Sequence, residues 1–365
     1  MNKDLLYQLA LTLVPKIGLV RAKILMQYFS TAEEIFKTPA RQLAQIESIG
    51  SHAAQEIASF SDFKTCENEI SFIEKHNIKV FSINDPDYPK RLLHCYDAPA
   101  LLFFKGNANL NAAKVISIVG TRQNSEYGKE FCERLLSDLQ DSGILVVSGL
   151  AFGMDTIAHK NAIKQQLATV AVVAHGLDRI YPAENKGLAQ QMVKHGGILT
   201  DFITDTRPDK QNFPKRNRIV AGICDALLVI ESGIKGGSLI TAELANSYNK
   251  DVFALPGRTI DARSEGCNYL IKTNKAQLIS NAKDLLNAMN WNENTQPIKK
   301  QRTLFLDLPH DQKIIFDILQ QQEKIHIDDL YLKTSLSSSN VAQALLMLEM
   351  EGVVKSLPGK MYQSI

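Results

Sequence analysis

The sequence has few cysteines, and no two of them have the spacing of a metal-binding or redox motif. The five cysteines among 365 residues are scattered, and no two form a C-x-x-C motif. An odd, scattered set argues against a disulfide framework and against a zinc site, and it is typical of a reducing cytosol. We therefore predict a cytoplasmic protein with no bound metal.

Long apolar runs and a charge imbalance are missing as well. The N-terminal stretch has only a short apolar segment, broken by Gln8, Thr12 and Pro15, and no later run is long enough for a membrane span. The 41 Lys and Arg residues against 39 Asp and Glu leave a net charge of +2. A membrane partner is not expected, and any anion site must come from local clustering of cations.

Apolar strands alternate with helices through the middle of the chain. This pattern indicates a parallel sheet covered by helices on both faces, and right-handed crossovers make it doubly wound. The predicted fold class is α/β, with an extended Rossmann-like, doubly wound, mostly parallel sheet and a ligand crevice at the carboxyl ends of its strands. The central strands are predicted at Val115–Val119, Ile144–Ser148, Thr169–Val173, Gly197–Thr200, Ala226–Ile230 and Asp251–Ala254.

Two smaller units flank this sheet. Before it, helical spacing and two apolar-x-x-Ile-Gly turns, ending at Gly18 and Gly50, predict a small all-α helix-hairpin-helix or SAM-like domain. A plain helical bundle explains these turns equally well. After it, three helices, a Ser-rich turn and a two-strand ribbon predict a winged-helix domain. The predicted boundaries are a helical domain at 1–62, the Rossmann-like domain at 63–288, a linker at 289–304 and the winged helix at 305–365.

The densest cation cluster is the stretch QNFPKRNR. Lys215, Arg216, Asn217 and Arg218 stand together at the start of an apolar helix. Helix N-termini attract anions, clustered cations neutralise phosphates, and the ring of Phe213 can stack on an unpaired base. The alternative is a solvated charge run, which the apolar helix that follows disfavours.

A glycine loop after the strand at 226–230 is a second candidate. Gly236 and Gly237 expose backbone N–H groups, and Ser238 and Thr241 add hydroxyls on one helical face. Such a loop can hold a phosphate at a helix N-terminus, although a plain glycine turn explains it too. It matches neither G-x-x-x-x-G-K-[ST] nor G-x-G-x-x-G, so no nucleotide cofactor is predicted.

Single residues at other strand ends complete the predicted site. Arg122 projects from the loop after the first central strand, where its planar fork suits a phosphate. Ser148 and Gly149 end the next strand, where small residues let a ligand approach the backbone. No nucleophile motif accompanies the polar loop at His175 and Asp178, so we predict no catalytic residue.

Together these clusters resemble the DprA/Smf family of DNA-processing proteins. The matching stretches are IVGTR, VVSGLAFGMDTIAH, HGLDRIYPAEN, NFPKRNRIVAG, GGSLITAELA, DVFALPG and EGCNYLI, which cover most of residues 75–286. The resemblance implies a domain that binds single-stranded DNA and forms a homodimer. It also implies a non-enzymatic protein that protects incoming strands and delivers them to the RecA recombinase in natural transformation and homologous recombination.

The resemblance also suggests roles for residues of this chain. It implies DNA contacts by the cations named above, with Lys186 as a further candidate, and a partner surface at Tyr269, Leu270 and Ile271. Two positions depart from the family pattern. Phe152 stands where the family usually has Arg, which removes a positive charge near the pocket, and Ala174-His175 replaces a usual Gly-Cys or Gly-Thr.

Two other functions stay open. A nucleotide phosphoribohydrolase of the lysine-decarboxylase-like type would use a similar glycine loop and Glu243 as its carboxylate. A transcription regulator would act through the winged helix. However, the helix predicted at Asn340–Glu351 has no Arg or Lys to touch phosphates or guanine, which favours a protein contact there.

Overall fold

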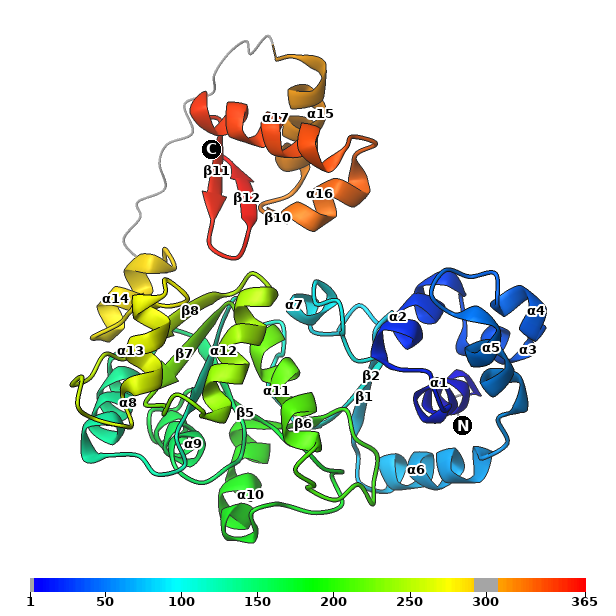
Figure 1. Cartoon of the computed structure of the whole chain (residues 1–365), viewed down its shortest axis with the longest axis horizontal. Helices are drawn as coiled ribbons and strands as arrows, with labels where there is room; N and C mark the ends of the chain where they lie inside the picture. The colour runs from blue at the N-terminus through cyan, green and yellow to red at the C-terminus, as the bar shows by residue number, and fades with distance from the viewer. Residues whose placement is uncertain (1–2, 292–307) are drawn as a thin grey trace.

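A central sheet carries a helical region at one side and a small C-terminal domain at another (Figure 1). The computed structural model describes residues 3–291 and 308–365. Most of the predicted linker at 289–304 lies outside these residues, and the predicted domain boundaries stay predictions. Within the described ranges, no helix combines the length and apolar character needed to cross a membrane.

The sheet has the order β1-β2-β6-β5-β4-β3-β7-β8-β9. From β6 to β9 in that order the strands are parallel, whereas β2 runs antiparallel to both β1 and β6. The chain moves outward from β3 to β6 and then returns to the other side of β3 with β7. The strands are β1 Lys79–Ser82, β2 Leu101–Gly106, β3 Lys114–Gly120, β4 Ile144–Ser148, β5 Thr169–Val172, β6 Gly196–Thr200, β7 Ala226–Ile230, β8 Asp251–Ala254 and β9 Gln277–Leu278.

The mostly parallel, doubly wound sheet predicted from the sequence is thereby confirmed. Each of the six predicted central strands is present, with ends shifted by at most one residue. The edge strand β9 was not predicted, because a pair of exposed residues leaves no apolar run to detect. The reversal of strand order at β3 and β7 places a ligand crevice at their carboxyl ends.

Successive residues of each strand pack on opposite faces of the sheet. In β3, Val115 and Val119 join one apolar cluster with α11 and α12, whereas Ile116 and Ile118 join another with α8, α9 and α14. Figure 1 shows α11 and α12 side by side over the sheet. The helices are α8 Glu126–Asp138, α9 Met154–Lys164, α10 Lys186–His195, α11 Asn212–Gly222, α12 Gly237–Ser247, α13 Glu265–Lys272 and α14 Ala282–Ala288.

The N-terminal region is helical, as predicted. Its apolar residues belong to the same core cluster as Val115 and Val119, on the face of the sheet that α11 and α12 cover. The region is therefore packed onto the sheet domain. The two Ile-Gly turns separate α1 from α2 and α4 from α5, and Gly50 begins α5 with a φ of +68°, a conformation that favours glycine. The helices are α1 Lys3–Leu13, α2 Leu19–Tyr28, α3 Ala32–Lys37, α4 Ala40–Leu43, α5 Gly50–Ser59 and α6 Phe63–Lys75.

The C-terminal unit is a winged helix with an apolar core of its own, which confirms the sequence prediction. Its short strands pair antiparallel in the order β10-β12-β11. Its elements are α15 His310–Gln321, β10 Ile325–His326, α16 Ile327–Lys333, α17 Ser338–Met350, β11 Val354–Leu357 and β12 Met361–Ser364.

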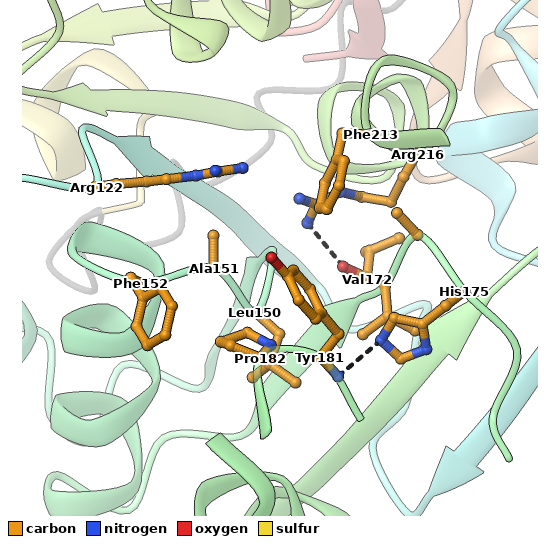
Figure 2. Close-up of a pocket in the computed structure, with 12 residues that line it drawn as sticks. Arg122, Leu150, Ala151, Phe152, Val172, His175, Tyr181, Pro182, Phe213 and Arg216 are labelled. Carbon is orange, nitrogen blue, oxygen red and sulfur yellow. Dashed lines mark hydrogen bonds between the residues drawn. The ribbon is translucent and has the colours of Figure 1, made fainter. Parts of the chain in front are cut away.

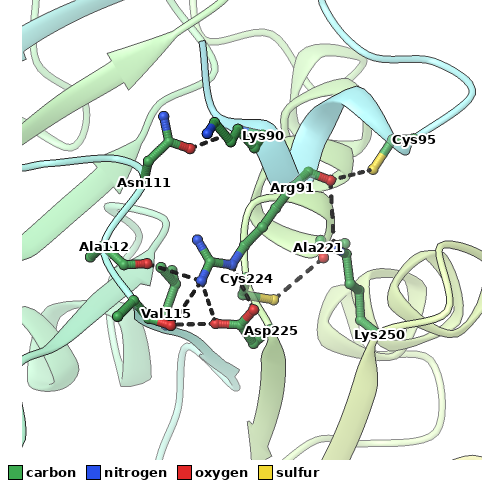
Figure 3. A network of polar contacts seen from close by, with 11 residues as sticks. Lys90, Arg91, Cys95, Asn111, Ala112, Val115, Ala221, Cys224, Asp225 and Lys250 are labelled. Atoms are coloured by element: carbon green, nitrogen blue, oxygen red, sulfur yellow. Dashed lines mark hydrogen bonds and ion pairs between the residues drawn. The ribbon is translucent and has the colours of Figure 1, made fainter. Parts of the chain in front are cut away.

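An ion pair at the amino ends of the strands joins the edge hairpin to the sheet (Figure 3). Arg91, on the short helix α7 (Lys90–Leu93), donates from Nε and Nη2 to the two carboxylate oxygens of Asp225, at 2.6 and 2.7 Å. Asp225 also accepts a bond of 2.9 Å from the Val115 N–H at the start of β3. This two-point pair therefore fixes the loop before β2 against β3 and β7.

The winged helix contacts the sheet domain through two stacked histidines. The rings of His94, after α7, and His326, in β10, have centroids 4.0 Å apart and planes 23° apart. The ligand atoms of these two residues and Asp328 all lie within 4.8 Å of one another. The nitrogen lone pairs of an imidazole lie in the plane of its ring, so the lone pairs of two nearly parallel stacked rings do not converge on one ion. This geometry therefore fits ring stacking better than a shared metal ion.

We predict that docking of the winged helix weakens in acid. Burial lowers the pKa of both histidines, and that of His326 falls from 6.5 to about 4 with His94 adding to the effect. The docked state therefore binds fewer protons than free imidazoles would, so docking is pH-independent above about 6.5 and weakens as the pH falls below that value. The measurement is the radius of gyration by small-angle scattering from pH 7.5 to 5. His94→Phe keeps a ring for stacking and should reduce the pH dependence; an unchanged profile would contradict this account.

Candidate functional site

A pocket opens at the carboxyl ends of β4 and β5, beside the first turn of α11 (Figure 2). Arg122 reaches it from the loop after β3, so four segments far apart in the sequence meet here. The lining residues are Arg122, Leu150, Ala151, Phe152, Val172, Val173, Ala174, His175, Tyr181, Pro182, Phe213 and Arg216. The sheet order predicts a ligand crevice at β3 and β7, and this pocket lies beside it, with Arg122 as its contact to the loop after β3.

Aromatic rings and one exposed cation form the rim of this pocket. The Arg122 guanidinium lies 5.5 Å from the centroid of the Phe213 ring, and Phe213 lies 6.2 Å from the ring of Tyr181. Phe152 and Tyr181 are each 46% exposed, which is unusual for large aromatic side chains. An exposed cation among available ring faces is the combination that holds a phosphate and an unstacked base.

Arg216 forms the floor of the pocket and is buried. Its Nη1 donates a bond of 2.7 Å to the carbonyl of Val172, which Figure 2 shows. Its guanidinium and the Asp155 carboxylate both lie against Gly149: a Cβ added there would meet Nη1 at 2.0 Å and Oδ2 at 2.3 Å. Gly149 is therefore required because two charged groups occupy the space of its missing side chain.

Burial dominates the protonation of this charged pair. Desolvation raises the pKa of Asp155, although the positive charges of Arg216 and Arg122 partly oppose it. Desolvation lowers the pKa of Arg216, opposed by Asp155. The charge of each group thus opposes the effect of burial on the pKa of the other, and the Ala151 N–H donates a bond of 3.3 Å to the Asp155 carboxylate.

Two buried histidines position the loops around the pocket. His159 contacts the Gly149 carbonyl at 2.5 Å through Nε2 and the Thr169 hydroxyl at 2.7 Å through Nδ1, and burial lowers its pKa to about 4. His175 contacts the Gly176 carbonyl through Nδ1 at 2.8 Å and accepts the Tyr181 N–H at Nε2. Both rings use both nitrogens inside the protein, so they serve as supports for the loops.

The side chains of the glycine loop after β7 are engaged within the protein, so only its backbone could meet an anion. The hydroxyl of Ser238 is buried and donates to Ser232 at 2.6 Å, and that of Thr241 donates to the Gly237 carbonyl at 3.3 Å. No side chain caps α12, and Gly237 is exposed with nothing within 4 Å of an added Cβ. The start of this helix is therefore at the surface at Gly237, where N–H groups without an intrahelical partner are available. The loop adjoins that of Arg122, because the Thr121 N–H donates to the Glu231 carbonyl at 2.8 Å.

The predicted cations divide into exposed and buried groups. Lys215, beside the pocket on α11, and Lys186, at the start of α10, are exposed, and Asn217 is half-buried. Arg218 is buried, paired with Asp201 and bonded to the Asp97 carbonyl at 2.5 Å. Its guanidinium is committed to the protein and does not face the pocket.

Three other predicted residues also point inward or away from the pocket. Ser148 is buried and donates its hydroxyl to the Ile118 carbonyl at 2.6 Å. Leu270, predicted on a partner surface, lies in the core at 0% exposure, whereas its neighbour Tyr269 is exposed and Ile271 is half-buried. Glu243, the carboxylate of the hydrolase alternative, is exposed and pairs with Lys275 at 2.8 Å.

Sequence reasoning missed two residues that shape the pocket. Tyr181 supplies a ring face, and the signal for it was an aromatic directly before a proline in a polar loop. Asp155 is the carboxylate whose charge acts on Arg216. It lies in the first turn of α9, six residues after Gly149, and nothing in this local sequence indicates that it lies near a residue of α11. The five cysteines are all buried, and burial raises the pKa of each thiol, so none is a ready nucleophile.

We predict that Gly149→Ala destabilises the protein by about 3 kcal/mol, because the new methyl group separates the buried Arg216 and Asp155 charges. Urea unfolding followed by circular dichroism measures this loss. Gly187→Ala is the matched control, since Gly187 lies in α10 with open space around its Cβ position, and it should be neutral or slightly stabilising. Equal effects of the two substitutions would refute the role of Gly149.

Comparison with known proteins agrees with this architecture. The family described as DNA recombination-mediator protein A matches residues 79–290, and the DprA winged helix domain matches residues 306–360. Protein Smf of Synechocystis sp. is 31% identical and covers 99% of each chain. DNA processing protein DprA of Streptococcus pneumoniae is 36% identical over 67% of this chain and 92% of its own length.

Solved structures give the same relationship. The X-ray structure of DNA processing protein A from Streptococcus pneumoniae superposes with a TM-score of 0.67 at 32% identity, covering 77% of this chain and 97% of that one. DNA processing protein A from Helicobacter pylori, solved to study its single-stranded DNA binding mode, gives a TM-score of 0.52 at 32% identity over 57% of this chain and 94% of that one. The chain therefore belongs to the DprA/Smf family, DNA recombination-mediator protein A with a C-terminal winged-helix domain.

Proposed function

We propose that this protein binds single-stranded DNA at the carboxyl edge of its sheet. The observation that carries the proposal is the exposed Arg122 guanidinium over the Phe213 ring, at the mouth of a pocket with two further exposed aromatic side chains. Unpaired bases offer free ring faces, which duplex DNA hides. The relative from Helicobacter pylori, known for its single-stranded DNA binding mode, supports the same ligand here.

The contacts divide between phosphates and bases. Arg122, Lys215 and Lys186 are the exposed cations for phosphates, and the N–H groups of Gly237 and Ser238 receive another at the start of α12. Phe213 stacks on a base. The buried groups Ser148, Gly149, Arg216 and Arg218 hold the pocket in shape, while Gly236, Asn217 and Thr241 shape the loop and helix around it.

The protein acts by binding, with no catalytic residue, in this proposal. The hydrolase alternative needs a carboxylate aimed at the sugar, and Glu243 instead forms an exposed pair with Lys275 and does not line the pocket. The carboxylate of Asp155 is buried against Gly149 and accepts the Ala151 N–H. Neither acid is placed for work on a bound nucleotide.

The wider role we infer is that of a cytoplasmic homodimer that protects incoming single strands and loads RecA onto them in natural transformation and homologous recombination. Family membership supports this role. The exposed Tyr269 and the half-buried Ile271, beside the edge strand β9, support a dimer contact there. In the winged helix, α17 carries no cation and exposes Leu346, Met347 and Met350, which supports a protein partner over DNA.

We predict that single-stranded DNA binds more tightly than duplex DNA and that Arg122→Ala and Lys215→Ala each weaken it. Each lost phosphate contact should lower the slope of log affinity against log salt by about 0.7. Fluorescence anisotropy of labelled oligonucleotides across a salt series measures both effects. Arg134→Ala, an exposed cation on α8, removes the same charge away from the pocket and should change little. Tight binding of a mononucleotide with release of free base would overturn the proposal in favour of the hydrolase.

A separate prediction concerns stacking. Phe213→Ala should weaken single-strand binding by roughly 1–3 kcal/mol while leaving the salt slope nearly unchanged, because stacking releases no counterions. The same anisotropy titrations give the answer. Phe213→Tyr keeps the ring and serves as the control. Unchanged affinity in Phe213→Ala would show that this ring supports Arg122 at most and does not hold a base.

A further inference from the structure

A second and larger hollow lies on the same edge of the sheet. It has a volume of about 1020 Å³ and is bounded by the segments that follow β3, β7 and β8. Its lining residues are Gln123, Ser125, Tyr127, Glu231, Pro256, Gly257, Arg258, Ile260, Asp261, Ala262, Arg263 and Ser264. None of these residues belongs to the predicted DNA contacts.

Two consecutive residues line the two hollows. Arg122 lines the first pocket and the next residue, Gln123, lines the second hollow. The bond from the Thr121 N–H to the Glu231 carbonyl holds this shared rim to β7. A strand that continues from the first pocket past Arg122 along the sheet edge therefore comes next to the lining of the second hollow.

The chemistry of the second hollow suits a polyanion. Arg258 and Arg263 are exposed on the loop between β8 and α13, and neither forms an ion pair with any described residue. The Glu231 carboxylate is buried and takes up both donors of Ser125, its N–H at 2.8 Å and its hydroxyl. Asp261 is thus the exposed carboxylate on the wall, opposite two guanidinium groups.

The wall also offers a ring face. Tyr127 is 49% exposed and its hydroxyl donates to the Pro256 carbonyl at 2.9 Å, which holds the ring in place. Ile260, at 86% exposure, adds apolar surface on the same loop. Like the first pocket, the second hollow combines exposed guanidinium groups with a ring face, which favours the same ligand over a protein partner.

We propose that the second hollow binds further nucleotides of the same single strand, with Arg258 and Arg263 on phosphates and Tyr127 against a base. The site rests on the function proposed above, and it extends the footprint from the carboxyl ends of β4 and β5 across β3 and β7 to β8. Affinity should therefore grow with strand length until both hollows are filled.

The test uses the full-length Arg258→Ala/Arg263→Ala variant with oligothymidylates from about 4 to about 16 nucleotides. Binding of the shortest strand should match wild type. Binding of the longest should fall roughly tenfold or more, and its salt slope should fall by about 1.4, which corresponds to two phosphate contacts. Lys64→Ala/Lys75→Ala is the matched control, because it removes two exposed cations from α6 and changes the net charge equally.

The outcomes separate this site from the first pocket. An equal loss at every length, or a loss no larger than that of the control, would overturn the second site and leave the first intact. If Arg122→Ala leaves binding of the shortest strand unchanged, the function itself fails. Tyr127→Ala removes the ring and should reproduce part of the length-dependent loss. Tyr127→Phe removes only the hydroxyl that holds the ring and is the control, with a smaller loss expected.

Discussion

The site depends on a guanidinium and a carboxylate buried together against one glycine. Arg216, Asp155 and Gly149 come from α11, α9 and the end of β4, and the Val172 carbonyl of β5 joins them. Burying either charge alone would cost several kcal/mol, so the two elements that carry them cannot separate. The same glycine offers its carbonyl to His159, which extends the constraint across α9 to Thr169. Gly149 thus lies where α11, the sheet and α9 come together, and its lack of a side chain lets them pack closely.

This constraint explains why neighbouring cations in one short stretch differ so much in role. The residues at 215–218 follow a helical course, so adjacent side chains point in different directions. Arg216 and Arg218 point inward to Asp155 and Asp201, and they orient the first turn of α11. Lys215 is left in solvent and Phe213 at the pocket, where Arg122 covers it. The buried arginines fix the position of the helix, whereas the exposed cations are the ones that a ligand could reach.

Most of the fold could be predicted from the sequence, because the apolar periodicity that marks a strand or a helix is visible within a few consecutive residues. Strands such as Ile144–Ser148 and Ala226–Ile230 are present at the predicted residues, and β9 escaped because its residues are exposed. Side-chain direction is different information. Nothing in NFPKRNR distinguishes Lys215 from Arg218, because Asp201, which pairs with Arg218, lies in a separate segment. The stacking of His94 on His326, across the sheet domain and the winged helix, has no local signal either. Pairings between distant segments are what the sequence alone leaves undetermined.

The aromatic rim bears on the near-neutral charge of the chain. A single-strand binder that works through counterion release loses affinity steeply as salt rises, whereas stacking on rings is much less sensitive to salt. Where the family usually has Arg, this chain has Phe152, which is exposed on the rim with Tyr181 and Phe213. Phe152 supplies an exposed ring face where an Arg would supply a positive charge. A protein with net charge +2 can therefore hold an unpaired strand if rings replace part of the cationic surface, because bases are available for stacking only when they are unpaired. In the proposed function, a preference for single strands therefore depends on ring faces more than on total charge.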